Sequence, residues 1–260
     1  MKNRRSFFKQ MIGVGAFGSF SMLSETLAAE ELIETIDHLK SLSIEDALQN
    51  EDYWKKIQQA YTVSKSHLNL NNGGVSPQPT IVLEAQKKYL EQTNEMPSLY
   101  LGRVFPRNRF ILREKLASLG GCLPQEIAIM QNTTEAMNTV MLGMDWKAGD
   151  EVIVSKQDYS TVKLGWKQLE KRHQIKLVWI DLPAPIENDA AILEIYLSKI
   201  TKKTKFINLT QIINWTGQII PVAVIAKICK KAREKGIFTL VDGAHSLAHI
   251  DFKISDLECD

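Results

Sequence analysis

The sequence predicts an α/β protein built on a mainly parallel sheet with helices on both faces. Short apolar stretches of four or five residues alternate with longer stretches in which apolar residues recur at helical spacing. This alternation is typical of parallel sheets, because a helix carries the chain back to the start of each next strand. The predicted strands cover residues 127–130, 151–154, 176–180, 205–209 and 237–241, and the predicted helices between them cover residues 133–142, 161–172, 190–200 and 222–235.

The composition is that of a globular protein and argues against several classes of function. The chain has 260 residues, of which 44% are hydrophobic and 24% charged. Its 32 basic and 30 acidic residues nearly cancel, so nucleic acid is not an expected partner. The three cysteines, Cys122, Cys229 and Cys259, lie far apart and form no CxxC pair, so we expect neither a disulfide framework nor a metal site.

Residues 1–29 resemble a twin-arginine (Tat) export signal. The basic and aromatic segment Asn3–Lys9 is followed by an apolar stretch, Met11–Leu23, and by small residues at Ala28 and Ala29. The apolar stretch is shorter than the roughly 20 residues of a membrane-spanning helix, so no stable membrane span is expected. The resemblance implies the Tat export machinery as a partner and a periplasmic location. A short basic amphipathic anchor is the alternative interpretation.

The rest of the chain divides into an N-terminal arm and a larger domain. Residues 30–90 are predicted to form a helical arm and a turn. Two helical stretches fall within residues 30–61, and the turn at Asn71–Pro77 is rich in Gly and Asn. Further helices are predicted over residues 80–92 and 108–119. Residues 91–260 are predicted to form the domain that holds the sheet.

Candidate ligand-binding residues follow the predicted strands, because open parallel sheets bind ligands beyond the carboxyl ends of their strands. Thr133 and Thr134 open a helix that Asn132 can cap, with Glu135 in the position of a capping box. Free backbone N–H groups at such a helix start bind phosphate well. Tyr159 follows the strand at residues 151–154 and could lie flat on a planar ring.

Three more candidates follow the later strands. Asn214 offers a donor and an acceptor, and Asp242 is an acid after a buried strand, which needs a partner such as a protonated pyridine nitrogen. His245 lies beside Asp242 in sequence. Each residue alone also fits an ordinary structural role as a helix cap, a half-buried side chain or a loop amide. Together they would bind a phosphate, a flat ring, a ring hydroxyl and a ring nitrogen, all of which pyridoxal 5′-phosphate (PLP) has.

The same segments resemble motifs of the class V aminotransferase family, over residues 66–260. Asn132–Val140 resembles the phosphate-binding segment of that family, Val241–His245 its pyridine-nitrogen segment, and Asn71–Gly74 its opening turn. The isopenicillin N epimerase-like and cysteine desulfurase-like branch is the most similar. The resemblance implies the large domain of a PLP-dependent transferase (type I) fold and PLP as cofactor, bound by Thr133, Thr134, Tyr159, Asn214, Asp242 and His245.

The resemblance also implies a homodimer, a small amino-acid-like substrate, and aminotransferase, epimerase or lyase chemistry through an aldimine. The chain departs from the family at its end. The Schiff-base lysine of the family follows the aspartate segment by a strand and a turn, but this sequence stops at Asp260. Lys253 comes too early and has no histidine before it. We therefore expect an incomplete large domain, with its C-terminal part missing and no catalytic residue among the 260.

Two alternatives remain open from the sequence. The product could be a non-catalytic truncated remnant that PLP does not stabilise. It could also be a nucleotide-binding α/β protein, although no predicted strand leads into a GxGxxG or GxxxxGK[ST] loop.

Overall fold

The computed structural model describes residues 43, 46, 49–64 and 66–260. The chain divides into two compact units, Met1–Tyr100 and Leu101–Asp260. The predicted export signal at residues 1–29 and most of the helical stretches predicted within residues 30–61 lie outside the described residues. Within the described part of the chain, no helix has the length and apolar character needed to cross a membrane.

The first unit contains the predicted turn between two helices. Helix α4 (Glu51–Gln59) is capped by Asn50, whose side chain accepts a hydrogen bond from the Tyr53 amide at 3.0 Å. Helix α5 (Thr80–Glu95) was predicted over residues 80–92, and the short α6 (Pro97–Leu99) follows it. In the turn between α4 and α5, the backbone amides of Gly74 and Val75 donate to the Asn71 carbonyl, each at 3.2 Å. The predicted boundaries at residues 29 and 90 stay predictions.

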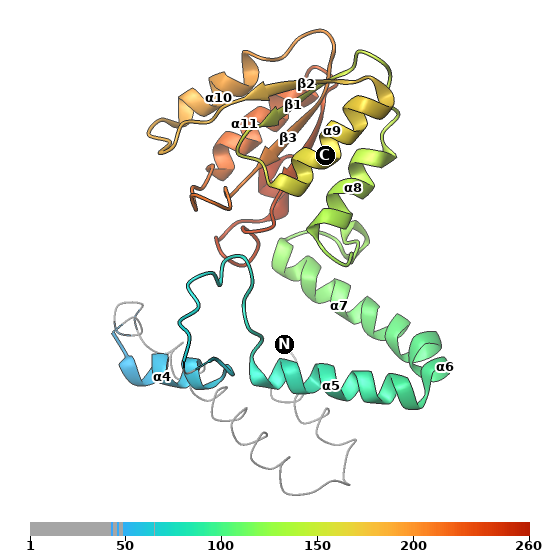
Figure 1. The fold of residues 1–260 in the computed structure, drawn as a ribbon, viewed down its shortest axis with the longest axis vertical. Helices are drawn as coiled ribbons and strands as arrows, with labels where there is room; N and C mark the ends of the chain where they lie inside the picture. Colours follow the sequence, from blue (N-terminus) through green and yellow to red (C-terminus); the bar gives the residue numbers. More distant parts are fainter. Residues whose placement is uncertain (1–42, 44–45, 47–48, 65) are drawn as a thin grey trace, which may run out of the picture. The chain divides into compact units, whose positions relative to one another are not determined.

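The second unit holds a parallel sheet of four strands in the spatial order β2-β1-β3-β4 (Figure 1). The predicted bounds of β2 are confirmed, and each of the other three strands lies within one residue of its prediction at either end. The strands are β1 (Glu151–Ser155), β2 (Lys176–Ile180), β3 (Thr204–Thr210) and β4 (Phe238–Asp242).

The helices of this unit are α7 (Phe105–Gly120), α8 (Thr133–Gly143), α9 (Ser160–His173), α10 (Asp189–Leu197) and α11 (Val222–Arg233), with shorter helical turns at Tyr100–Val104, Pro124–Glu126 and Ile254–Leu257.

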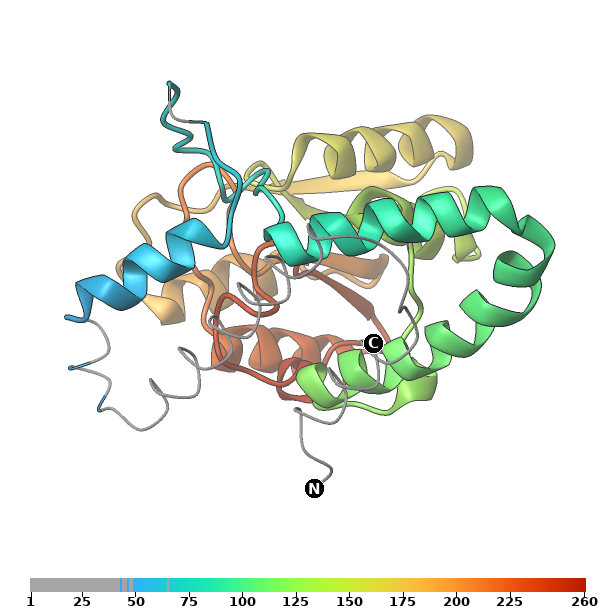
Figure 2. The same cartoon turned by 90° about the horizontal axis from the view of Figure 1, so that it is seen from below.

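Alternate side chains of the strands face two separate hydrophobic clusters, which places helices on both faces of the sheet. Val152 and Val154 of β1 join a cluster with side chains of α8 and α9, whereas Ile153 joins a cluster with side chains of α10 and α11. Both views show the sheet between α9 and α11 (Figures 1 and 2). The two-sided burial explains why the strands are continuously apolar, and the predicted layered α/β architecture is confirmed.

Three aromatic rings fill the face covered by α8 and α9. The rings of Trp146 and Trp166 meet edge to face with centroids 5.8 Å apart, and Phe206 of β3 lies 5.2 Å from Trp166. Trp166 is fully buried, and the indole N–H of Trp146 donates to the Met141 carbonyl at 2.7 Å. Such ring pairs contribute roughly 0.5–1.5 kcal/mol beyond the area that they bury.

The prediction of a strand at residues 127–130 is wrong. This segment is extended but forms no ladder, and Ile129 is 41% exposed. A strand exists only through its partner, and each of the four described strands pairs only with its neighbours in the order given above. The apolar residues indicated burial, but they carried no information about a partner. The helix after this segment nevertheless begins at Thr133, as predicted.

Candidate cofactor site

The candidate site lies where the chain reverses its direction of travel across the sheet. From β1 the chain moves outward to β2 and then returns to the other side of β1 to form β3. The connections that leave the carboxyl ends of β1 and β3 therefore run to opposite sides, and open parallel sheets commonly bind ligands at such a switch point. The residues that follow β1 and β3 flank this switch point, and those that follow β4 lie next to it.

The start of α8 has the features of a phosphate site. Asn132 accepts a hydrogen bond from the Glu135 amide at 2.9 Å, and Glu135 accepts one from the Gln131 amide at 2.7 Å, which confirms the predicted cap. Thr133 and Thr134 occupy the first two positions of the helix and are exposed. The Thr134 hydroxyl lies 3.3 Å from that of Thr161 in the first turn of α9. Two helix starts, each with free N–H groups, therefore meet here.

Tyr159 lies in the loop after β1, directly before α9. It is the N-cap residue of that helix, and its side chain is 45% exposed. The preceding loop is fixed by Gln157, whose amide donates to Asp181 at 2.7 Å and to the Leu182 carbonyl at 3.1 Å. The loop after β1 is thus tied to the loop after β2, and the exposed ring of Tyr159 is carried on a rigid support.

Asp242 ends β4 and is 6% exposed. It pairs with Thr210 of β3 in the ladder, and its carboxylate accepts a hydrogen bond from the Ala244 amide at 3.0 Å. Burial raises the pKa of this carboxyl, while the Ala244 amide and a nearby charge on His245 act in the opposite direction. Among the described residues, no lysine or arginine forms an ion pair with Asp242. A buried acid in this state can accept a cationic partner.

Asn214 lies in an exposed turn after β3. The turn is closed by the Gly217 amide, which donates to the Ile213 carbonyl at 2.8 Å, and Gly217 adopts a φ of 70°, where glycine is favoured. In the described part of the chain, no hydrogen bond joins Asn214, Thr133 or Thr134 to Asp242. The structure therefore places the predicted residues at one edge of the sheet without linking them directly.

The sequence interpretation missed two buried residues of this edge. Asp158, next to Tyr159, is 2% exposed and accepts three hydrogen bonds from groups of β1 and β3. Gln211 directly follows β3, is fully buried, and neither its amide oxygen nor its amide nitrogen has a hydrogen-bond partner in the described structure. The signal for Asp158 was present, because it is an acid just after a buried strand, as is Asp242.

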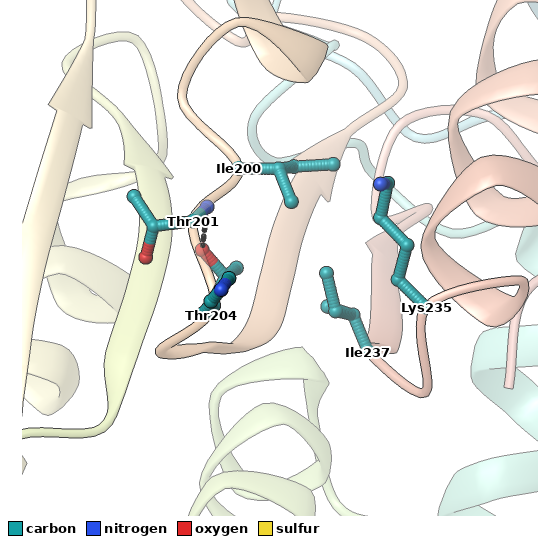
Figure 3. Close-up of a pocket in the computed structure, with 6 residues that line it drawn as sticks. Ile200, Thr201, Thr204, Lys235 and Ile237 are labelled. Atoms are coloured by element: carbon teal, nitrogen blue, oxygen red, sulfur yellow. Dashed lines mark hydrogen bonds between the residues drawn. The ribbon is translucent and has the colours of Figure 1, made fainter.

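The opposite edge of the sheet contains a cavity of about 470 Å³. It lies at the start of β3 and before β4, and Figure 3 shows Ile200, Ile237 and Lys235 around it, with the Thr201 amide donating to the Thr204 hydroxyl. This is the amino end of the strands, away from the switch point at their carboxyl ends. Elsewhere in the described residues, no cluster of three or more His, Cys, Asp or Glu side chains could hold a metal ion.

The chain belongs to the class V aminotransferase family, whose model matches residues 68–260. Among curated relatives, isopenicillin N epimerase of Streptomyces clavuligerus is 28% identical over 207 residues, which cover 80% of this chain and 51% of that protein. Cysteine desulfurase of Pectobacterium atrosepticum is 31% identical over 154 residues, which cover 57% of this chain and 36% of that protein. The chain spans about half the length, or less, of the curated relatives it matches.

Solved structures confirm the predicted type I fold. The cystine C-S lyase C-DES, solved with its product cysteine persulfide, matches with a TM-score of 0.64 and 27% identity over 73% of this chain and 50% of that one. A variant of the same lyase was solved with glycine covalently linked to its PLP cofactor. Pyridoxal 5′-phosphate is therefore the cofactor of the family to which this chain belongs.

Proposed function

We propose that the chain is the cofactor-binding part of a PLP-dependent enzyme that acts on an amino-acid-like substrate by aminotransferase, epimerase or lyase chemistry. The observation that carries the proposal is Asp242, an acid that is 6% exposed, at the carboxyl edge of the sheet, with no lysine or arginine paired to it in the described structure. Its surroundings suit a cationic ring. The exposed helix start at Thr133 suits the phosphate of the same ligand, so the residues present fit PLP.

Each residue of the site has a distinct task in this proposal. Asp242 holds a proton on the pyridine nitrogen, because a buried carboxylate stabilises the cationic form of its partner. Thr133 and Thr134 bind the phosphate through the start of α8, and Tyr159 stacks on the ring. Asn214 and His245 fix the orientation of the ring. When bound, PLP supplies an electron sink for bond breaking at the substrate Cα.

Binding of pyridoxamine 5′-phosphate tests the site directly, since this probe has the ring and phosphate but no aldehyde to react with surface lysines. We expect the chain to bind it, and Asp242→Asn to weaken binding by roughly 30-fold, because the loss of one member of a buried charge pair costs about 2 kcal/mol or more. Glu234→Gln, which removes an exposed charge paired with Lys231, is the control. Absence of binding, or equal binding by Asp242→Asn, would refute the site.

The reaction is tested on the protein purified from its native source. Borohydride reduction is expected to leave a pyridoxyl group on a lysine, in a protein whose mass exceeds the 29.4 kDa of this sequence. We also propose that the enzyme is a homodimer, as the family resemblance implies, and expect analytical ultracentrifugation of the same sample to give twice the mass of one chain. A protein of 29.4 kDa or less without the adduct would refute the enzyme proposal and favour a non-catalytic product.

We also propose export by the Tat route to the periplasm, supported by Arg4 and Arg5 before the apolar stretch. The double change Arg4→Lys and Arg5→Lys is expected to retain the protein in the cytoplasm, as measured by cell fractionation. Unchanged membrane association of both proteins would favour the basic anchor instead.

A further inference from the structure

A second buried acid lies at the same edge of the sheet as Asp242. The carboxylate of Asp158 accepts hydrogen bonds from the Ser155 amide at 2.9 Å and the Asn208 side-chain amide at 2.9 Å, both on Oδ2. Its Oδ1 accepts from the Thr210 hydroxyl at 2.8 Å. All three contacts suit an ionised carboxylate, which only accepts hydrogen bonds. Asp158 therefore joins β1 to β3 at their carboxyl ends.

Asp158 is connected to Asp242 through the end of β3. Thr210, which donates to Asp158, is the ladder partner of Asp242, and the backbone N–H of Gln211 donates to the backbone carbonyl of Asp242 at 3.1 Å. The end of β3 is thus held between the two acids. The bonds to Asp158 also fix the loop that carries Tyr159, the residue next in sequence.

The described ionisable neighbours of Asp158 are acidic side chains, and His245 acts on Asp242 instead. On the side of β4 Asp158 faces Asp242, with His245 beside that residue, and on the side of α10 it faces the hydroxyl of Tyr196. The part of the chain that the structure describes contains no ion pair to Asp158. Burial raises the pKa of this carboxyl to about 6, and the negative charge of Asp242 adds to the rise against the three hydrogen bonds.

We infer that Asp158 is a positioning residue of the cofactor site: it holds Thr210 beside Asp242, and its charge makes the capture of a pyridinium ring depend on pH. The inference rests on the proposed function. A cation bound at Asp242 is attracted by both carboxylates, and the low-dielectric surroundings strengthen the attraction. By linkage, the bound ring favours the ionised form of Asp158, so binding is accompanied by release of its proton when the pH lies below the pKa.

The sign of the effect follows from this linkage. Above pH 6 Asp158 is ionised and favours the ring, and below pH 6 it is protonated and the contribution disappears. Asp158→Asn is neutral at every pH. The new amide can donate to the Thr210 hydroxyl, while its oxygen keeps the contacts with Ser155 and Asn208, so this variant retains the hydrogen-bond pattern.

Pyridoxamine 5′-phosphate affinity, followed by quenching of tryptophan fluorescence between about pH 5 and pH 8, provides the test. We expect Asp158→Asn to bind about tenfold more weakly than the parent at pH 8 and within about twofold of it at pH 5, a difference typical of one nearby charge in a protein. The titrations of the free ligand affect both affinities alike and cancel in the ratio. Glu234→Gln is expected to match the parent at all pH values.

Thr210→Val supplies a second variant. Loss of the donated hydrogen bond destabilises the ionised carboxylate, so the pH at which the affinity changes is expected to move upward. A purely structural role would lower the affinity without moving this midpoint. If the parent binds the ligand but the ratio to Asp158→Asn is constant across pH, or Thr210→Val leaves the midpoint in place, this inference is wrong while the proposed function stands. If the parent does not bind at any pH, both are wrong.

Discussion

Strand β1 begins and ends near a buried acid, and the two acids have opposite surroundings. At the amino end, Glu151 accepts hydrogen bonds from the Thr201 hydroxyl at 2.5 Å and the Lys176 ammonium at 3.0 Å, which lower the pKa of its carboxyl. At the carboxyl end, Asp158 has neutral donors only, and its pKa is raised to about 6. Among the described residues, a lysine is paired with the acid at the amino end of the strand, and no cation is paired with the acid at the carboxyl end.

The largest expected effect comes from removing the charge at the carboxyl edge. In the ligand-free protein, the raised pKa of Asp158 means that the folded state binds a proton more tightly than the unfolded state. This residue therefore reduces stability as the pH rises from about 4 to above 6. Relative to Asp158→Asn, the parent is expected to lose about 3 kcal/mol of unfolding free energy between about pH 3 and pH 8.

Urea unfolding of both proteins at several pH values measures this change. Asp52→Asn, at an exposed side chain, serves as the charge-matched control. If the difference in unfolding free energy between the parent and Asp158→Asn is the same across this pH range, the pKa of Asp158 is not raised in the folded protein. The two acids near the ends of β1 would then not have the opposite surroundings described above.

A smaller effect of opposite pH dependence is expected at the amino edge. Thr201→Val removes the hydroxyl that donates to Glu151, at a cost of about 2 kcal/mol, as is typical of hydrogen bonds to charged groups. The pKa of Glu151 is lowered in the folded protein, so its stabilisation is present above pH 4.5 and is lost as the pH falls through the folded value. The defect of the variant is therefore expected to shrink in acid.

Thermal unfolding of Thr201→Val at pH 7 and pH 3 checks this expectation. Thr139→Val is a suitable control, because the exposed Thr139 hydroxyl donates only to a carbonyl of its own helix. An acid-insensitive defect would show that Glu151 is not stabilised through its charge.

The smallest expected effect on stability comes from removing a helix N-cap, and two such variants distinguish a role in capping from a role in ligand binding. Asn132→Ala and Asn188→Ala each remove an N-cap, of α8 and α10 respectively, and each is expected to cost about 1 kcal/mol of stability. Only Asn132 caps the helix whose start is assigned to the phosphate. Isothermal titration with pyridoxamine 5′-phosphate is therefore expected to show weaker binding for Asn132→Ala alone. Equal losses of affinity in both variants would contradict a phosphate site at α8.

The local pattern predicted the four paired strands and their helices well, because strand and helix periodicity are short-range properties. Lys176–Ile180 is bounded by polar residues and a turn, and its limits were predicted correctly. The segment at residues 127–130 has the same apolar character, yet it forms no strand, since pairing depends on residues far away in sequence.

Only part of the site was predicted, because some of its contacts join residues that lie far apart in sequence. Asp242 could be identified because an acid after an apolar strand is buried by its position. Asp158 obeys the same rule, but its role depends on Asn208 and Thr210, which lie 50 and 52 residues away. Gln211 gave no local signal, since its burial arises from the packing of the whole carboxyl edge.

The tryptophans differ in their surroundings, and the difference gives the molecule two separate optical probes. Trp146 and Trp166 lie in the interior against Phe206, so their near-ultraviolet circular dichroism depends on intact packing. Trp215 is 63% exposed, and its indole N–H points to the backbone carbonyl of Gln157 at 3.5 Å, in the loop after β1. A ligand that arrives there changes the emission of Trp215 while the dichroism of the buried pair stays constant, whereas unfolding changes both.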